Sequence, residues 1–167
     1  ERYKDSESWE AGVRIFDVSD PRNPKEIHFF ETPGKGVHRM WFVDGRYAHI
    51  TPTQEGYTNQ IYMILDLKDP RNPKVISKWW IDGMWEAGGE KPTWDPDKRV
   101  RAHGPPIDID NKVYLGWTDG GFTILDISDM SNPKQIAYMN WCPPYGGLTH
   151  TVLPLPERDL IVVSDEA

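Results

Sequence analysis

The chain contains three stretches in which a short apolar run ends in aspartate and is followed by a loop containing proline. The first spans Gly12 to Lys25 and reads Gly-Val-Arg-Ile-Phe-Asp-Val-Ser-Asp-Pro-Arg-Asn-Pro-Lys, and related stretches occupy residues 61–74 and 121–134. The apolar runs are rich in β-branched residues and are bounded by turn residues, so they predict strands. Because proline cannot donate to a strand ladder, a loop must follow each run, and a second strand follows the loop.

Two further strands are expected between one such unit and the next. They form hairpins: Arg39–Val43 with Tyr47–Ile50, Pro106–Ile109 with Val113–Trp117, and Thr151–Leu155 with Leu160–Val163. Each repeat therefore predicts four antiparallel strands. Self-similarity at a spacing of roughly 40–50 residues is typical of a β-propeller, in which each four-stranded sheet is one blade.

We therefore expect an all-β chain that forms a single β-propeller segment over residues 1–167, with about three blades' worth of strands. The repeat cores are residues 12–30, 61–80 and 121–139, and a long loop at 82–102 joins two blades. Three blades are too few for a closed ring, since propellers have about four to eight. The expected partners are the remaining blades of the same propeller, which we favour, or a second copy of the chain, because open sheet edges invite association.

Two of the repeats resemble a known family. Residues 13–24, Val-Arg-Ile-Phe-Asp-Val-Ser-Asp-Pro-x-Asn-Pro, and residues 122–133, Phe-Thr-Ile-Leu-Asp-Ile-Ser-Asp-x-x-Asn-Pro, are similar to the LVIVD-repeat family of β-propeller proteins. The resemblance covers the three repeat cores and, through their spacing, nearly the whole chain. It implies the propeller fold but little about activity, because a propeller can carry many different functions.

Composition excludes several classes of function. A net charge of −7 and the shortness of the longest basic run, Lys98–Arg101, argue against nucleic-acid binding. The single cysteine, Cys142, excludes an internal disulfide and a zinc site built from cysteines. No apolar run reaches the length of a membrane span, so we expect none. The compartment stays open, and we favour the cytoplasm.

One histidine occupies the same place in each of three repeats, just before the predicted inner strand of a blade. These are His38, His103 and His150, which lie 65 and then 47 residues apart. Because equivalent loops of neighbouring blades lie on one face of a propeller, the three side chains should converge at one end of its axis. Neutral imidazole binds first-row metals, and three protein ligands leave a position open for water or substrate. The sequence thus predicts a divalent iron, zinc or manganese site, with hydrogen bonding between blades as the alternative role.

Loop carboxylates on the same face are the candidate catalytic groups. Glu55, Asp165 and Glu166 follow predicted strands there and could orient the histidines or transfer protons. The alternative is that each is a solvated loop residue. Another set of aspartates recurs at the end of the first strand of each repeat and is expected to bind backbone amides of the following turn: Asp17, Asp66 and Asp126.

Aromatic residues in the loops are the candidate substrate-binding groups. Trp85 and Trp94 belong to the long loop, which has the length typical of a lid or binding loop, and Trp141 and Tyr145 belong to the next such loop. Arg39, beside the first histidine, completes the predicted set. Aromatic side chains over a channel mouth indicate an apolar or aromatic ligand, and packing within the loops is the alternative.

The favoured interpretation is a metal-dependent enzyme that acts on a small apolar or aromatic molecule. The sequence does not distinguish an oxidoreductase from a lyase or a hydrolase. The alternative is a non-catalytic propeller that serves as a scaffold for protein or ligand binding. A carbohydrate-binding role for the loop tryptophans ranks third, because few polar clusters accompany them.

Overall fold

The computed structural model describes residues 10–42 and 44–166; residues 1–9, Val43 and Ala167 lie outside the described part. Within these ranges the chain has twelve strands and two short 3-10 helices. The strands are β1 (Ala11–Asp17), β2 (Lys25–Thr32), β3 (Val37–Trp41), β4 (Tyr47–Pro52), β5 (Tyr62–Asp66), β6 (Lys74–Trp79), β7 (Ile107–Ile109), β8 (Lys112–Gly116), β9 (Phe122–Asp126), β10 (Lys134–Met139), β11 (Thr149–Leu155) and β12 (Leu160–Asp165). The helices are η1 (Glu86–Gly88) and η2 (Pro156–Arg158). None of the helices in the described ranges is long and apolar enough to cross a membrane.

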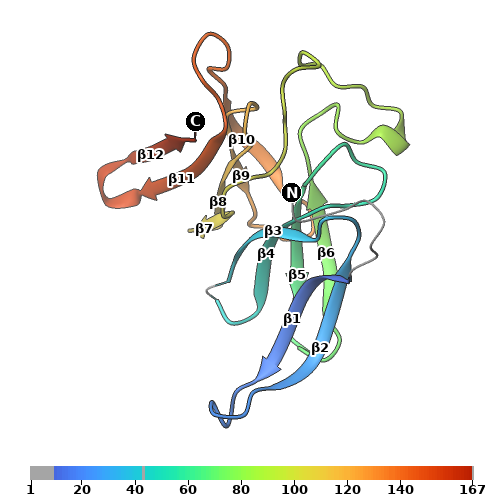
Figure 1. Ribbon diagram of the computed structural model, residues 1–167. Helices are drawn as coiled ribbons and strands as arrows, with labels where there is room; N and C mark the ends of the chain where they lie inside the picture. Colours follow the sequence, from blue (N-terminus) through green and yellow to red (C-terminus); the bar gives the residue numbers. More distant parts are fainter. Residues whose placement is uncertain (1–9, 43, 167) are drawn as a thin grey trace.

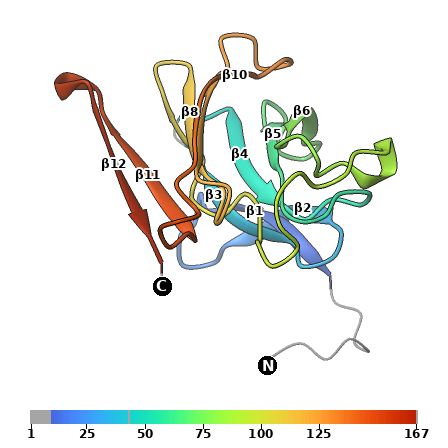
Figure 2. The ribbon, with the colours of Figure 1, turned by 90° about the horizontal axis from the view of Figure 1, so that it is seen from above.

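The strands form two complete four-stranded sheets and two hairpins. One sheet has the order β3-β4-β5-β6 and the other β7-β8-β9-β10, and every neighbouring pair is antiparallel. The hairpins, β1-β2 and β11-β12, are called half-blades below. These four strand groups follow one another in chain order (Figures 1 and 2). The predicted all-β fold and four-stranded antiparallel sheets are therefore confirmed, while the described residues form no closed ring.

The loop inside each repeat core is closed by its aspartate, as predicted. The amide of Ser19 donates to Asp17 Oδ1 at 2.8 Å, and the amide of Lys68 donates to Asp66 Oδ1 at 2.8 Å. The third repeat has the same hydrogen bond to Asp126 at 2.9 Å. Each carboxylate thus satisfies an amide that has left the strand ladder, which explains why aspartate ends the apolar run in every repeat.

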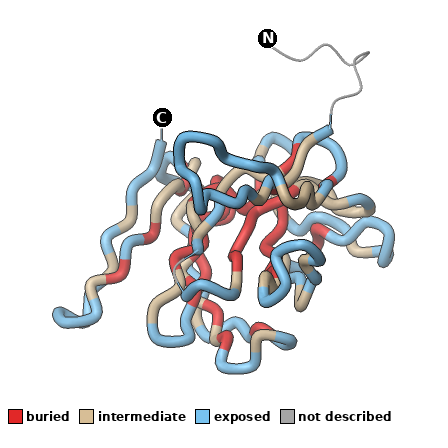
Figure 3. The backbone as a smooth tube through the Cα atoms, turned by 90° about the horizontal axis from the view of Figure 1, so that it is seen from below, coloured by how far each residue is buried: buried red, intermediate tan, exposed pale blue. Residues whose placement is uncertain are grey.

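Apolar side chains join neighbouring strand groups. The largest buried cluster contains Tyr62 and Ile64 of one sheet and Leu115 and Trp117 from the next. Trp79 lies against Trp117 in an edge-to-face arrangement with ring centroids 5.4 Å apart, so these two tryptophans pack between neighbouring sheets. Figure 3 shows the buried segments running through the middle of the molecule. The sheets thereby hold one another at fixed positions, which matters for any site built from several of them.

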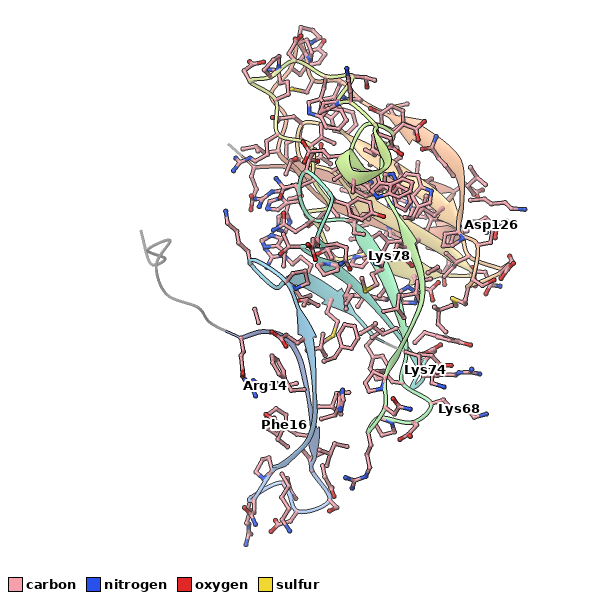
Figure 4. The ribbon with its side chains drawn as sticks, turned by 90° about the vertical axis from the view of Figure 1, so that its right-hand side faces the viewer. Arg14, Phe16, Lys68, Lys74, Lys78 and Asp126 are labelled. Carbon is pink, nitrogen blue, oxygen red and sulfur yellow. The ribbon has the colours of Figure 1, made fainter. Side chains whose placement is uncertain are left out.

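The half-blades leave two strand edges open. Among residues 10–42 and 44–166, β1 pairs with β2 alone and β12 pairs with β11 alone. Large apolar side chains are exposed there, including Phe16 on β1 and Leu160 and Val162 on β12. Figure 4 shows Phe16 and Arg14 on the β1 strand. Exposed apolar edges of this kind favour pairing with further strands.

Candidate functional site

Three imidazole rings meet at one end of the sheets. The rings of His38 and His103 are stacked, with centroids 4.7 Å apart and planes 8° from parallel. The ring of His150 meets His103 edge-on, at 5.0 Å and 90°. His38 and His150 are the second residues of β3 and β11, whereas His103 lies four residues before β7. The expected position just before a strand is therefore wrong for two of them, yet the three rings do lie together; they are called the histidine cluster below.

Two glycines allow the segments that carry His103 and His150 to approach closely. The amide of His103 donates to the carbonyl oxygen of Gly116 at 2.9 Å. A Cβ atom at Gly116 would lie 2.8 Å from the carbonyl oxygen of Thr149 and 2.9 Å from that of His150. A Cβ atom at Gly104 would overlap the carbonyl oxygen of His150 outright. The missing side chains therefore determine how near the two histidines can come.

The hydrogen bonds of His150 fix its tautomer. Arg39 Nη2 lies 2.9 Å from Nε2 of this ring, and because a guanidinium only donates, Nε2 accepts. The Nδ1 atom lies 2.6 Å from Thr151 Oγ1 and carries the proton of the neutral ring. The carboxylate of Glu166 lies 3.7 Å from Nε2 of His150 and 3.8 Å from Nε2 of His103. Glu166 therefore faces ring nitrogens of two histidines at distances longer than a hydrogen bond.

The other two rings are held in the neutral form. Burial lowers the pKa of His38 to about 4, and the charges of Arg39 and Arg101 act in the same direction. Burial followed by the charge of Arg101 lowers the pKa of His103 to about 4. Within the described residues, Nε2 of His38 and Nδ1 of His103 are buried and have no hydrogen-bond partner. Such atoms are rare in proteins, so each calls for an explanation.

Comparison with known protein families bears on the sheet next to the cluster. Residues 110–139, which contain β8, β9 and β10, match the family model of the LVIVD repeat. The chain carries an LVIVD repeat. The resemblance seen in the sequence is therefore confirmed for the third repeat, and this repeat is associated with β-propellers. A search of curated proteins found no match. The LVIVD segment includes none of the three histidines, so the match supports the fold and gives no information about their role.

The histidine cluster fits a metal in its chemistry and only partly in its geometry. Within residues 10–42 and 44–166, no group of three or more His, Cys, Asp or Glu side chains is arranged to hold a metal ion. Ligand atoms lie about 2.0–2.2 Å from zinc, so two of them are at most about 4.4 Å apart. The separations of Glu166 from His103 and His150 lie inside that limit. Ligation by His150 additionally requires Arg39 to leave its Nε2 atom.

The three predicted catalytic carboxylates have different surroundings. Glu166 is half exposed and faces the cluster. Asp165 accepts hydrogen bonds from Thr149 Oγ1 and Trp141 Nε1, both at 2.8 Å, and thus holds the start of β11. Glu55 is exposed in the loop between β4 and β5. The structure therefore brings only the first of these into the neighbourhood of the imidazole rings.

The four predicted aromatic residues have different surroundings. Trp85 stacks with Tyr57, at 6.4 Å between centroids, and meets Trp80 edge-on at 5.7 Å. Trp94 lines a separate cavity of about 310 Å³. Tyr145 is exposed over most of its surface, at 71 %. None of the four predicted aromatic residues, all of which lie in the described part, lines the cavity beside the histidines.

Two further sets of residues lie at this end, and the first of them was not predicted. Lys35 and Arg101 bring positive charge to the cavity beside the histidines. Asp119 accepts the amide of Arg99 at 2.8 Å and the amide of Leu148 at 3.2 Å. This carboxylate thereby ties the long loop to the segment before β11, and it controls where two of the three histidine segments run.

Proposed function

We propose that the chain is part of a metal-dependent β-propeller enzyme that holds a divalent first-row transition metal, iron, zinc or manganese, between His38, His103 and His150. The proposal rests on one observation: three imidazoles from separate strand groups meet, and two of them have a buried ring nitrogen without a partner among the described residues. A metal ion that accepts the lone pairs of these nitrogens would explain why they are buried without a partner.

The side chains around the rings have distinct roles in this proposal. The lowered pKa values of His38 and His103 keep both rings neutral at pH 7, which is the form that ligates a metal. Thr151 Oγ1 accepts the proton of Nδ1 in the tautomer whose Nε2 lone pair points at Arg39, and that lone pair becomes free for a metal once Arg39 moves. A bound metal would act as a Lewis acid or activate a water or oxygen molecule.

Carboxylates near the cluster supply the acid and base chemistry. Glu166 faces Nε2 of His103 and of His150 and would move a proton there, because the nitrogen of His103 left for the metal is Nδ1. Asp165 positions the start of β11 through Thr149 and would keep His150 in place. Glu55 is assigned to the rim of this face, where it would meet substrate as it enters.

We propose that the half-blades are completed to give a closed propeller. In the intact sheets Tyr47 pairs with Asp66, and Lys112 pairs with Asp126. If a second copy of the chain completes the blade, the same register would place Leu160 of β12 opposite Asp17 in β1 of that copy. The completing strands come from the remaining blades of the same propeller or from a second copy of the chain, since two strands of each half-blade add up to one four-stranded blade.

Elemental analysis of the purified protein tests the metal site. Wild-type protein should carry a stoichiometric first-row metal, and His103→Ala should lose most of it. His28→Ala is the matched control, because His28 lies on β2 outside the cluster and its replacement should leave the metal content unchanged. The proposal is wrong if the purified wild-type protein is free of metal and also takes up no iron, zinc or manganese on dialysis.

A non-catalytic scaffold is the second candidate, and two observations favour it. Arg39 already occupies Nε2 of His150, so this histidine can serve as a hydrogen-bonded contact between sheets. The outer strand β10 also exposes Ile136, Tyr138 and Met139, an apolar surface that could receive a protein partner. Loss of stability in His103→Ala, without any metal in the wild type, would select this function over the enzyme.

A further inference from the structure

A cavity of about 520 Å³ opens beside the histidine cluster. It lies between the start of β1, the start of β3 and the loops before β5 and β7, and is called the cluster cavity here. Its lining consists of Glu10, Ala11, Lys35, Val37, His38, Gln60 and Arg101. The volume is in the range of small-molecule sites, and the lining is mostly polar, with Ala11 and Val37 as its apolar members, which suits a ligand that carries a charge.

Arg101 carries a positive charge into this cavity, and the carboxylate whose charge acts on it, that of Glu166, lies too far away to form an ion pair with it. The side chain is half-buried, and its Nη1 atom donates to Gln60 Oε1 at a long 3.4 Å. Its Nε atom is buried and has no hydrogen-bond partner, and no ion pair of Arg101 occurs within the described residues. Burying the Nε–H group of a guanidinium without an acceptor lowers the stability of the fold, unless a ligand supplies that acceptor.

The charges of the cavity lining, Arg101 included, add up to a single positive charge. Lys35 and Arg101 contribute two positive charges, and the exposed Glu10 contributes one negative charge. The rest of the protein is acidic, with a net charge of −7. A local positive charge on an acidic chain attracts small anions selectively, whereas a nucleic-acid backbone would be repelled by the surrounding surface.

We propose that the cluster cavity binds a small organic carboxylate. Arg101 turns the edge that carries its buried Nε toward the cavity, so that the two carboxylate oxygens accept from Nε and Nη, and the apolar body lies along Val37 and Ala11. The planar guanidinium matches a carboxylate in a fork of parallel hydrogen bonds. A monoanion balances the single net charge of the lining, whereas a dianion would be left facing Glu10. Because His38 lines the same cavity, the bound molecule would be the substrate of the metal site, a point that rests on the function proposed above.

Calorimetric titration of metal-free protein with benzoate tests this site. The metal is removed with a chelator that is then dialysed away, so that the result does not depend on whether the metal site exists. Benzoate should bind, and benzyl alcohol, which has the same ring without the charge, should not. Arg101→Gln should weaken benzoate binding about tenfold or more, the effect of losing a charged hydrogen bond. Arg22→Gln, which removes an exposed arginine in the β1–β2 turn, should not change it.

Other outcomes would overturn the assignment. Equal binding of benzoate by Arg101→Gln and wild type, equal binding of benzyl alcohol and benzoate, or no benzoate binding at all would each do so. Inorganic phosphate that binds as tightly as benzoate would also contradict a carboxylate site. Lys35→Gln covers the case in which Arg101→Gln does not fold: Lys35 is exposed, and its replacement should weaken benzoate binding by several-fold.

Discussion

Replacing Gly116 by alanine should damage the histidine cluster without touching a histidine. A Cβ atom there would lie 2.8 Å and 2.9 Å from two carbonyl oxygens of β11, closer than the 3.0 Å below which real Cβ atoms essentially never come. Both obstacles are backbone atoms, so the whole strand has to move, and a comfortable distance requires a displacement of about half an ångström. Metal sites tolerate errors of only about 0.2 Å in ligand distance.

The expected effect of Gly116→Ala follows from that displacement. Moving His150 away from His103 by half an ångström should weaken metal binding about 10- to 100-fold, as loss of ligand positioning does elsewhere. Overpacking of this size should also lower the free energy of unfolding by about 1–3 kcal/mol. Gly104→Ala should lower both the metal affinity and the free energy of unfolding further, because its Cβ atom would overlap the carbonyl oxygen of His150.

The assay is a zinc titration by calorimetry, accompanied by urea unfolding of the metal-free proteins. Gly146→Ala is the matched control, since a Cβ atom at Gly146 meets nothing within 4 Å. The order of zinc affinity should be Gly146→Ala, then Gly116→Ala, then Gly104→Ala. Equal affinity in all three variants would refute the argument that close approach of these two segments builds the site.

Three further predictions concern stability in the absence of metal. In the unfolded chain His38 and His103 have their ordinary pKa of 6.5, whereas in the folded protein their pKa is about 4. The unfolded chain therefore binds more protons between these values, and the free energy of unfolding should fall as the pH drops from 6.5 to 4, by up to about 1.4 kcal/mol per pH unit for each ring. Urea unfolding at several pH values will measure this fall. Asp119→Ala frees two backbone amides and should cost about 1–3 kcal/mol in the same assay. Tyr62→Phe removes the hydroxyl that lies 2.6 Å from Nδ1 of the buried His49 and should cost about as much, so a variant as stable as wild type would show that this contact is dispensable.

The strands were predictable because their signals are local. An apolar run ending at Asp17 or Asp66, followed by a loop with two prolines, leaves few alternatives, and the observed strands β1 and β5 end at these residues. The four-stranded order followed from counting strands between repeats. The open edges at β1 and β12 also follow from that count, whereas the number of blades in a closed ring depends on strands outside the described residues.

The site was predictable only in part, because side-chain partners come from other segments. Repeat spacing indicated that the three histidines would share one end of the sheets, and their rings do lie together. Sequence distance gives no information about ring orientation or about the arginine that occupies Nε2 of His150. Trp85 was expected to face a ligand because it stands in a long loop, yet Trp80 and Tyr57 pack against it.

Charge provides the clearest case in which composition was a poor guide. The basic run at 98–101 is too short to carry nucleic-acid binding, and on an acidic chain it predicted no other binding site. Folding separates its members: Lys98 pairs with Asp97, whereas Arg101 is drawn inward beside Gln60. A net charge describes the average surface, and a ligand responds to the charge of the cavity that it enters.

The backbone is held differently at the three histidines, and this shapes what the site can do. His38 and His150 lie in β3 and β11 at breaks in the strand register, so neither has a partner residue on the neighbouring strand. His103 lies outside any strand, and its amide is anchored to the Gly116 carbonyl oxygen. A register break of this kind redirects a side chain of the strand, and here it accompanies both strand histidines of the cluster. Gly116 sets His103 against the segment that carries His150, which is why a small displacement at Gly116 should affect the site more than the fold.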